Sequence, residues 1–167
     1  MKKIKKIPIN ANGLSIYLIP AFCDNVSAII AINGLALVID PGESQRVIAC
    51  LKKNSLSLKS ILITHAHSDH IGGVLRLKEE TGCTIFGSKK QGFELTDIFL
   101  ADKQIVSFGP LRLMAIDTPG HAKGHVAYFI LHENILFAGD LIFNGGCGKI
   151  FEGTVTEMVN SLEKIQL

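Results

Sequence analysis

The segment Thr64–His70 is the sequence feature that most restricts which folds this chain can adopt. It directly follows the apolar, strand-like run Ile61–Ile63, and it carries three histidines and one aspartate: His65, His67, Asp69 and His70. Imidazole and carboxylate groups are common ligands of zinc, iron and related divalent ions. Because core packing does not explain so many such groups in so short a segment, the sequence predicts a metal site here.

The metal-ligand run is expected to lie on a loop between a strand and a helix. The apolar spacing after it predicts a helix over His70–Thr81, with Ile71, Val74, Leu75 and Leu77 on its inner face and Gly82 as its stop. In α/β sheets, sites form at the carboxyl ends of strands. His65 and His67 are two residues apart, so on an extended segment they can point the same way.

The apolar pattern along the rest of the chain predicts sheets covered by helices in layers, which is an α/β fold. A chain of 167 residues is expected to form one domain, residues 1–167.

Asn33-Gly34 predicts a hairpin, and Lys89–Lys103 is expected to be a loop with one helical turn. Two further helices are expected at Ser44–Lys53, with Val47, Ile48 and Leu51 inward, and from Thr154 or Thr156 onward, with Met158, Val159, Leu162 and Ile165 on one side. The expected strands are Leu14–Ile19, Val26–Ile32, Leu35–Ile39, Ile61–Ile63, Thr84–Phe86, Gln104–Phe108, Leu111–Asp117, Val126–Leu131 and Ile135–Ala138.

Composition argues against several functional classes. A net charge of +2 with 19% charged residues predicts no nucleic-acid or membrane surface, and no apolar run is long enough for a transmembrane helix. The basic start at residues 2–6 has no apolar run after it, so we expect no signal peptide. The four cysteines follow no metal or redox spacing and predict reduced thiols in a cytoplasmic protein: Cys23, Cys50, Cys83 and Cys147.

Two later segments add candidate ligands at the ends of expected strands. His121 follows Thr118-Pro119-Gly120, and Asp140 follows the strand Ile135–Ala138. One nitrogen-rich metal site would use His65, His67 and His121. A second metal site would start from Asp69 and His70, with Asp140 as an oxygen bridge. Two other histidines are assigned no ligand role: His125 is expected to form structural hydrogen bonds and His132 to be solvated.

Together these segments resemble the metallo-β-lactamase superfamily. The resemblance rests on Asp40-Pro41-Gly42, on the pattern His-x-His-x-Asp-His at residues 65–70, on Thr118-Pro119-Gly120-His121 with His125, and on Gly139-Asp140. The order and spacing of these motifs match across nearly the whole chain. The resemblance implies a four-layer αββα sandwich with the metals at one edge, between two sheets.

Two further stretches resemble glyoxalase II, the hydroxyacylglutathione hydrolases. They are residues 140–154, with Gly146-Cys147-Gly148-Lys149-Ile150-Phe151-Glu152-Gly153-Thr154, and Ile19–Asn25 near the start. The resemblance implies hydrolysis of the thioester S-D-lactoylglutathione, or a related acyl-glutathione, to D-lactate and glutathione with one or two zinc ions. It implies the metal ligands named above, Asp69 as the group that orients the attacking hydroxide, and contacts to glutathione from Lys149, Ile150 and Phe151. Iron or manganese also suits this ligand set.

The chain departs from glyoxalase II at its C-terminal side. The resemblance places one more histidine of the second metal site, and a helical glutathione-binding domain, beyond residue 167. We therefore expect a C-terminally short member, with a weak second site and poor hydrolysis. Three alternatives remain: another hydrolase of the superfamily acting on a lactam, lactone or phosphodiester, an iron-dependent sulfur dioxygenase, and a weakly active metal-binding remnant.

Overall fold

The structure of the chain is a computed structural model that describes residues 3–10 and 13–166. Lys2, from the basic start of the chain, lies outside the described residues. The chain forms two compact units. Unit 1 comprises residues 1–63, 67–86 and 95–98, and unit 2 comprises residues 64–66, 87–94 and 99–167. The boundary therefore falls inside the metal-ligand run, between Ala66 and His67.

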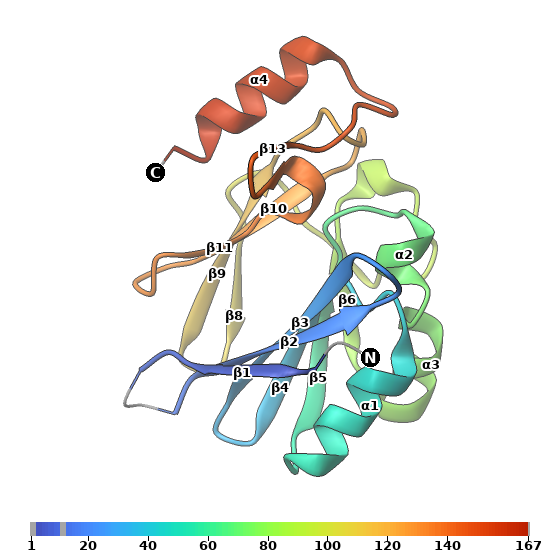
Figure 1. Ribbon diagram of the computed structural model, residues 1–167, viewed down its shortest axis with the longest axis vertical. Coiled ribbons are helices and arrows are strands. Elements are labelled where there is room, and N and C mark those ends of the chain that lie inside the picture. The colour runs from blue at the N-terminus through green and yellow to red at the C-terminus, as the bar shows by residue number, and fades with distance from the viewer. Residues whose placement is uncertain (1–2, 11–12, 167) are drawn as a thin grey trace. The chain divides into compact units, whose positions relative to one another are not determined.

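Unit 1 is built on a sheet whose strands follow one another in chain order from β1 to β7. The first four strands pair antiparallel, whereas β4–β5 and β5–β6 pair parallel (Figure 1). β3 and β4 are almost continuously buried, which explains their unbroken apolar runs. The strands are β1 (Lys5–Pro8), β2 (Ser15–Ala21), β3 (Asn25–Ile32), β4 (Leu35–Ile39), β5 (Ser57–Leu62), β6 (Thr84–Gly87) and the short β7 (Ile98–Phe99), through which the unit boundary runs.

The strand pattern agrees well with the sequence analysis in this unit. The expected strands are confirmed with ends shifted by a residue or two, except that β5 begins earlier, at Ser57. The hairpin between β3 and β4 is confirmed, with Asn33 at φ 51° and Gly34 at φ 75°. Positive φ at both central positions is what a tight hairpin turn between twisted strands needs. The expected loop between Lys89 and Lys103 contains β7, which the sequence did not reveal.

Helix α1 (Ser44–Lys53) has the bounds that the sequence predicted, with Val47, Cys50 and Leu51 buried. Ile48, expected on the inner face, is only half-buried. Figure 1 shows α1 beside α3 (Val74–Thr81) within the unit. Gly82 ends α3 at φ 66°, as expected.

The prediction of a single helix over His70–Thr81 is wrong. The structure has a short helix α2 (Ser68–Ile71), then a break at Gly72-Gly73, then α3. A Cβ at Gly72 would lie 2.5 Å from the carbonyl oxygen of Gly42, and one at Gly73 would lie 2.7 Å from that of Pro41. The break therefore lets the backbone approach the Asp40-Pro41-Gly42 turn. Val74 and Leu77 are buried as expected, Ile71 is half-buried, and Leu75 is 52% exposed, so its assignment to the inner face is wrong.

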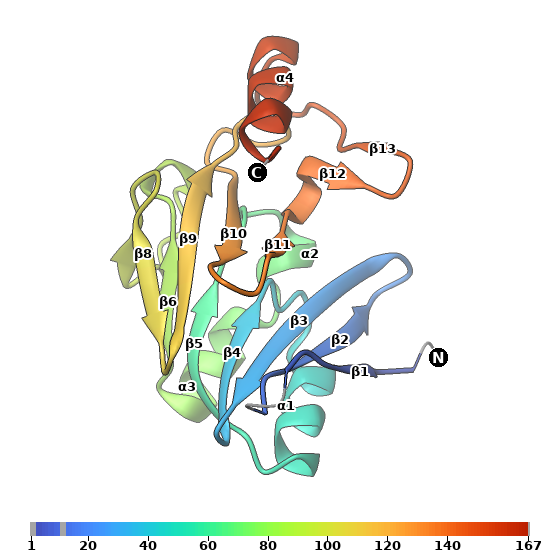
Figure 2. The ribbon, with the colours of Figure 1, turned by 90° about the vertical axis from the view of Figure 1, so that its left-hand side faces the viewer.

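Unit 2 is built on an antiparallel sheet in the order β11-β10-β9-β8 (Figure 2). Its strands confirm the expected ones with small shifts of their ends: β8 (Ile105–Phe108), β9 (Leu111–Asp117), β10 (Val126–Ile130) and β11 (Ile135–Phe137). Two 3₁₀ turns, η1 (Lys89–Gln91) and η2 (Gly139–Leu141), and a small hairpin of β12 (Ile142–Phe143) and β13 (Gly146–Cys147) complete the unit with α4 (Val155–Lys164).

Helix α4 begins at a capping box, in which Thr154 accepts a hydrogen bond from the Glu157 N–H and Glu157 accepts one from the Thr154 N–H. Its buried side chains are Met158 and Ser161, and the Ser161 hydroxyl donates to the Pro119 carbonyl at 2.6 Å. The expected inner position of Val159 is wrong, because this side chain is 47% exposed. The hydrogen bond from Ser161 to Pro119 fixes the helix to the loop that carries His121.

Among residues 3–10 and 13–166, no helix combines the length and the apolar character needed to cross a membrane.

Candidate metal centre

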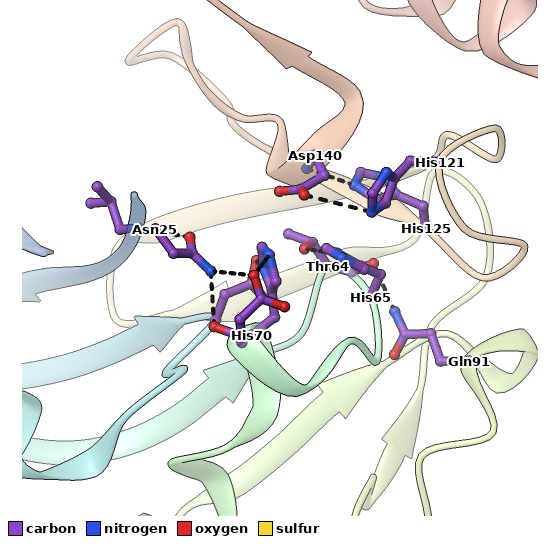
Figure 3. A network of polar contacts seen from close by, with 11 residues as sticks. Asn25, Thr64, His65, His70, Gln91, His121, His125 and Asp140 are labelled. Atoms are coloured by element: carbon purple, nitrogen blue, oxygen red, sulfur yellow. Dashed lines mark hydrogen bonds and ion pairs between the residues drawn. The ribbon is translucent and has the colours of Figure 1, made fainter. Parts of the chain in front are cut away.

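Unit 2 brings three of the expected ligands together. His65 and His121 are buried, with 0% and 3% exposure, and their rings meet edge to face with centroids 4.8 Å apart. His121 Nε2 lies 3.5 Å from Asp140 Oδ2 (Figure 3). His65 lies just beyond β5, His121 lies on the loop after β9, and Asp140 lies on η2 after β11. Three strand ends therefore supply two imidazoles and a carboxylate, which is a donor set suited to a divalent metal.

The hydrogen bonds of His121 fix which of its nitrogens can bind a metal. Its Nδ1 lies 2.7 Å from the Lys149 carbonyl oxygen. Because a carbonyl only accepts, Nδ1 carries the proton and donates it, which leaves the lone pair on Nε2, the atom that faces Asp140. Metal-binding histidines usually donate their second nitrogen to a carbonyl or carboxylate in this way. The residues of unit 2 therefore fit a metal.

His125 confirms its expected structural role. It is 1% exposed, its Nε2 accepts a hydrogen bond from the Asp140 backbone N–H at 3.1 Å, and its Nδ1 lies 2.8 Å from Thr118 Oγ1. Since Nε2 accepts, the neutral ring must carry its proton on Nδ1 and donate it to Thr118. A Cβ at Gly139 would lie 2.6 Å from His125 Nε2, so the chain can reach this position only as glycine. His125 thereby fixes the backbone that presents the Asp140 carboxylate.

Unit 1 holds the other expected ligands, His67, Asp69 and His70, at and inside α2. His70 is 3% exposed, its Nδ1 lies 2.9 Å from Asp40 Oδ2, and its Nε2 lies 3.6 Å from Asp69 Oδ2. The Asp40 carboxylate accepts the Nδ1 proton, which leaves the Nε2 lone pair on the side of Asp69. His67, half-buried, is the residue before α2, and its carbonyl accepts the His70 N–H at 2.9 Å.

The Asp69 carboxylate is exposed but held in place. The Asn25 side-chain amide donates to the Asp69 carbonyl at 2.8 Å and to Asp69 Oδ2 at 3.2 Å. A Cβ at Gly42 would lie 1.9 Å from the Asp69 carbonyl oxygen, so only glycine permits this approach. One amide thus restrains both the backbone and the side chain of the residue expected to orient the attacking group.

The segment Lys149–Phe151 packs beside His121. The Phe151 ring meets the His121 ring edge to face at 5.3 Å, and Lys149 Nζ lies 4.9 Å from the centre of the Phe151 ring. The backbone N–H of Phe151 donates to the His121 carbonyl at 3.1 Å. Phe151 is 60% exposed, Lys149 is exposed and Ile150 is half-buried. A cation and an aromatic face are therefore available to a ligand next to one of the imidazoles.

Sequence reasoning missed several supporting residues. Asp40 was recognised as part of a motif but assigned no contact, and Asn25, Thr64 and Gln91 were assigned no role. Asn25, Asp40 and Gln91 contact residues 27 to 44 positions away, so only a folded chain reveals these pairings. The Thr64 hydroxyl lies 3.0 Å from Nδ1 of the adjacent His65. The left-handed φ of 48° at the buried Asp40 is a conformation that residues other than glycine rarely adopt, and such conformations gather at functional sites. His132 is exposed in a turn, as expected.

The chain belongs to the metallo-beta-lactamase superfamily, because the sequence model of that family matches residues 21–167. Membership implies a divalent metal site, in agreement with the donor set described above. The fold is similar to that of the metallo-beta-lactamase IND-7, with a TM-score of 0.80 and 20% identity over 99% of this chain and 85% of that chain. This likeness confirms the expected fold class.

Two relatives indicate a narrower similarity. A hydroxyacylglutathione hydrolase of Ectopseudomonas mendocina is 38% identical over 155 residues, covering 91% of this chain and 60% of that protein. A hydroxyacylglutathione hydrolase of Pelagibacter ubique is 40% identical over 157 residues, covering 92% of this chain and 66% of that protein. The chain thus spans less than two thirds of the length of either relative.

Proposed function

We propose that the chain is a metal-dependent thioester hydrolase that acts on S-D-lactoylglutathione or a related acyl-glutathione. The main support is the similarity to hydroxyacylglutathione hydrolases over about nine tenths of this chain, together with the matching stretch at residues 140–154. The partner is then a small molecule. The protein's own contribution is a set of buried imidazoles whose proton positions suit metal binding.

The proposed metal ligands are the six residues that the sequence predicts. His65, His67 and His121 would hold one ion, Asp69 and His70 would hold a second, and Asp140 would bridge the two. Only Ala66 separates His65 from His67 along the chain. Nitrogen and carboxylate donors suit zinc, and they also suit iron and manganese.

The reaction would combine metal chemistry with positioning by this chain. A bound divalent ion lowers the pKa of coordinated water toward about 7 and polarises a carbonyl group. Asp69, restrained by Asn25, would accept a hydrogen bond from the attacking water and so orient it toward the acyl carbon. Lys149 would meet a carboxylate of glutathione as a point charge, beside the face of Phe151. Thioester hydrolysis then releases the thiol of glutathione and the free hydroxy acid.

The test combines metal analysis with a hydrolysis assay on the purified chain. We expect His67→Ala to lose most of the bound zinc, because even the loss of a residue that supports a ligand weakens metal binding by about 10–100-fold. His132→Asn is the matched control, since His132 lies in an exposed turn at φ 69° and asparagine tolerates that conformation. Wild-type protein should release thiol from S-D-lactoylglutathione, and His67→Ala should not. Unchanged metal content in His67→Ala, or no hydrolysis by the metal-loaded wild type, would contradict the proposal.

A further inference from the structure

Gln91 joins two loops of unit 2 through a single amide nitrogen. Its side-chain Nε2 donates to the Thr64 carbonyl at 2.8 Å and to the Gly124 carbonyl at 3.0 Å. The side-chain amide of glutamine carries two N–H donors, so one such group can serve both carbonyls. Figure 3 shows Gln91 directed at the segment of Thr64 and His65. A half-buried polar side chain with two partners from separate loops is a cross-link and not a surface group.

Both carbonyls belong to residues that immediately precede a histidine of the centre. Thr64 precedes His65, and Gly124 precedes His125, which accepts the hydrogen bond of the Asp140 backbone. The Thr64 carbonyl also accepts the Val126 N–H at 2.8 Å, so both lone pairs of this oxygen are used. The orientation of the peptide bond that leads into His65 is therefore set from two sides.

The turn that carries Gln91 is itself fixed. The buried Ser88 hydroxyl caps η1 by accepting the Lys90 N–H at 3.2 Å. A Cβ at Gly124 would lie 2.4 Å from the Gln91 backbone nitrogen, so the two backbones approach closely. Gln91 thus reaches the two carbonyls from a backbone position that has little freedom to shift.

From these contacts we infer that Gln91 is a positioning residue for the metal centre. Through the Thr64 carbonyl it holds the peptide bond that leads into His65. Through the Gly124 carbonyl it holds the peptide bond that leads into His125, which in turn binds the Asp140 backbone. The inference rests on the proposed metal-binding function, and it assigns the residue no contact with metal or substrate. Its loss should therefore loosen two ligands at once without removing either of them.

The test is a set of variants at this position, read by metal affinity. Gln91→Met keeps the length of the side chain but has no donor, Gln91→Glu places acceptors against the two carbonyls, and Gln91→Lys restores a donor. We expect Met and Glu to weaken zinc binding about 10–100-fold and to change the visible spectrum of the cobalt-substituted protein, whereas Lys recovers part of the affinity. Lys90→Ala is the control: it removes the exposed ion pair between Lys90 Nζ and Asp117 Oδ2 from the same turn, and because exposed ion pairs contribute little, it should retain wild-type affinity.

The outcomes separate this inference from the proposed function. Wild-type chain that binds zinc tightly, together with a folded Met or Glu variant of equal affinity and unchanged cobalt spectrum, would overturn the role of Gln91 alone. Equal losses in Lys90→Ala and in the Gln91 variants would overturn it as well, because the placement of the turn and not the amide would then matter. Wild-type chain that binds no zinc would overturn both statements. Reduced affinity in Met and Glu with recovery in Lys supports the inference.

Discussion

Replacement of His125 by alanine should destabilise the protein even before any metal is added. The change removes the acceptor of the Asp140 N–H at 3.1 Å and the donor to Thr118 Oγ1 at 2.8 Å. Thr118 is 0% exposed and loses its partner without access to water, which costs about 1–3 kcal/mol. The Asp140 N–H is closer to solvent, so we assign about 1 kcal/mol to its lost bond. The sum is about 3 kcal/mol, before any contribution from the cavity left by the ring.

The assay is urea and thermal unfolding of the metal-free protein. For a domain of this size 1 kcal/mol corresponds to about 2–4 °C, so the midpoint should fall by roughly 6–12 °C. His132→Asn is the control and should leave the midpoint nearly unchanged, because His132 is exposed. His125→Asn retains a side-chain amide that can donate to Thr118 and should fall between the two. A loss below about 1 kcal/mol for His125→Ala would refute the reasoning that both hydrogen bonds are made by a buried, neutral ring.

Two further predictions concern side chains whose pKa is shifted in the folded protein: Asp97 and the buried cysteines Cys50 and Cys83. The hydrogen bond from Lys78 at 2.6 Å, together with one from the Ile85 N–H, lowers the pKa of Asp97. The ionised carboxylate therefore stabilises the folded protein at pH values above the pKa of Asp97 in the unfolded chain. This stabilisation is lost as the pH falls through the lower pKa of the folded state. Asp97→Asn should therefore cost about 1 kcal/mol at pH 7 in urea unfolding and progressively less in acid, and a cost independent of pH would contradict the assignment. Burial raises the pKa of the Cys50 and Cys83 thiols, so iodoacetamide should modify the exposed Cys23 and Cys147 first, and equal labelling of all four in the native protein, measured by mass spectrometry, would argue against the structure.

Much of the fold follows from local patterns in the sequence. The apolar runs of β2–β4 and the Asn33-Gly34 turn are local signals, and α1 and β9 were predicted with their observed bounds. The break at Gly72-Gly73 was not predictable, because its reason is the approach of a turn some thirty residues earlier in the chain. The exposure of Leu75 has a similar origin: the spacing of apolar residues identifies a helix, whereas what covers each face depends on the tertiary packing.

The candidate ligands were also accessible to sequence reasoning, since they cluster at strand ends and are residue types with few other uses there. Their supporting residues were not. Asn25, Asp40 and Gln91 are ordinary polar residues in loops and turns, and their partners lie 27 to 44 positions away. A hydrogen bond at that separation leaves no periodic pattern in the sequence. The geometry that makes a cluster of histidines a metal site is therefore the part that only the folded structure supplies.

The contacts that support the proposed metal ligands differ between the two units. In unit 1, the Nδ1 proton of His70 is accepted by a carboxylate, Asp40, whereas in unit 2 that of His121 is accepted by a neutral backbone carbonyl. A carboxylate partner raises the basicity of an imidazole ligand more than a carbonyl does, because it stabilises positive charge on the ring. His70 should therefore be the stronger electron donor of the two.

In unit 2, the buried His65 and His125 rings lie 5.3 Å apart, so the neutral, hydrogen-bonded state of His125 matters: a second cation there would repel a bound metal. The Asp140 N–H favours that neutral state because it needs an acceptor on His125 Nε2, whereas Thr118 accepts the proton of Nδ1 and so fixes the orientation of the ring.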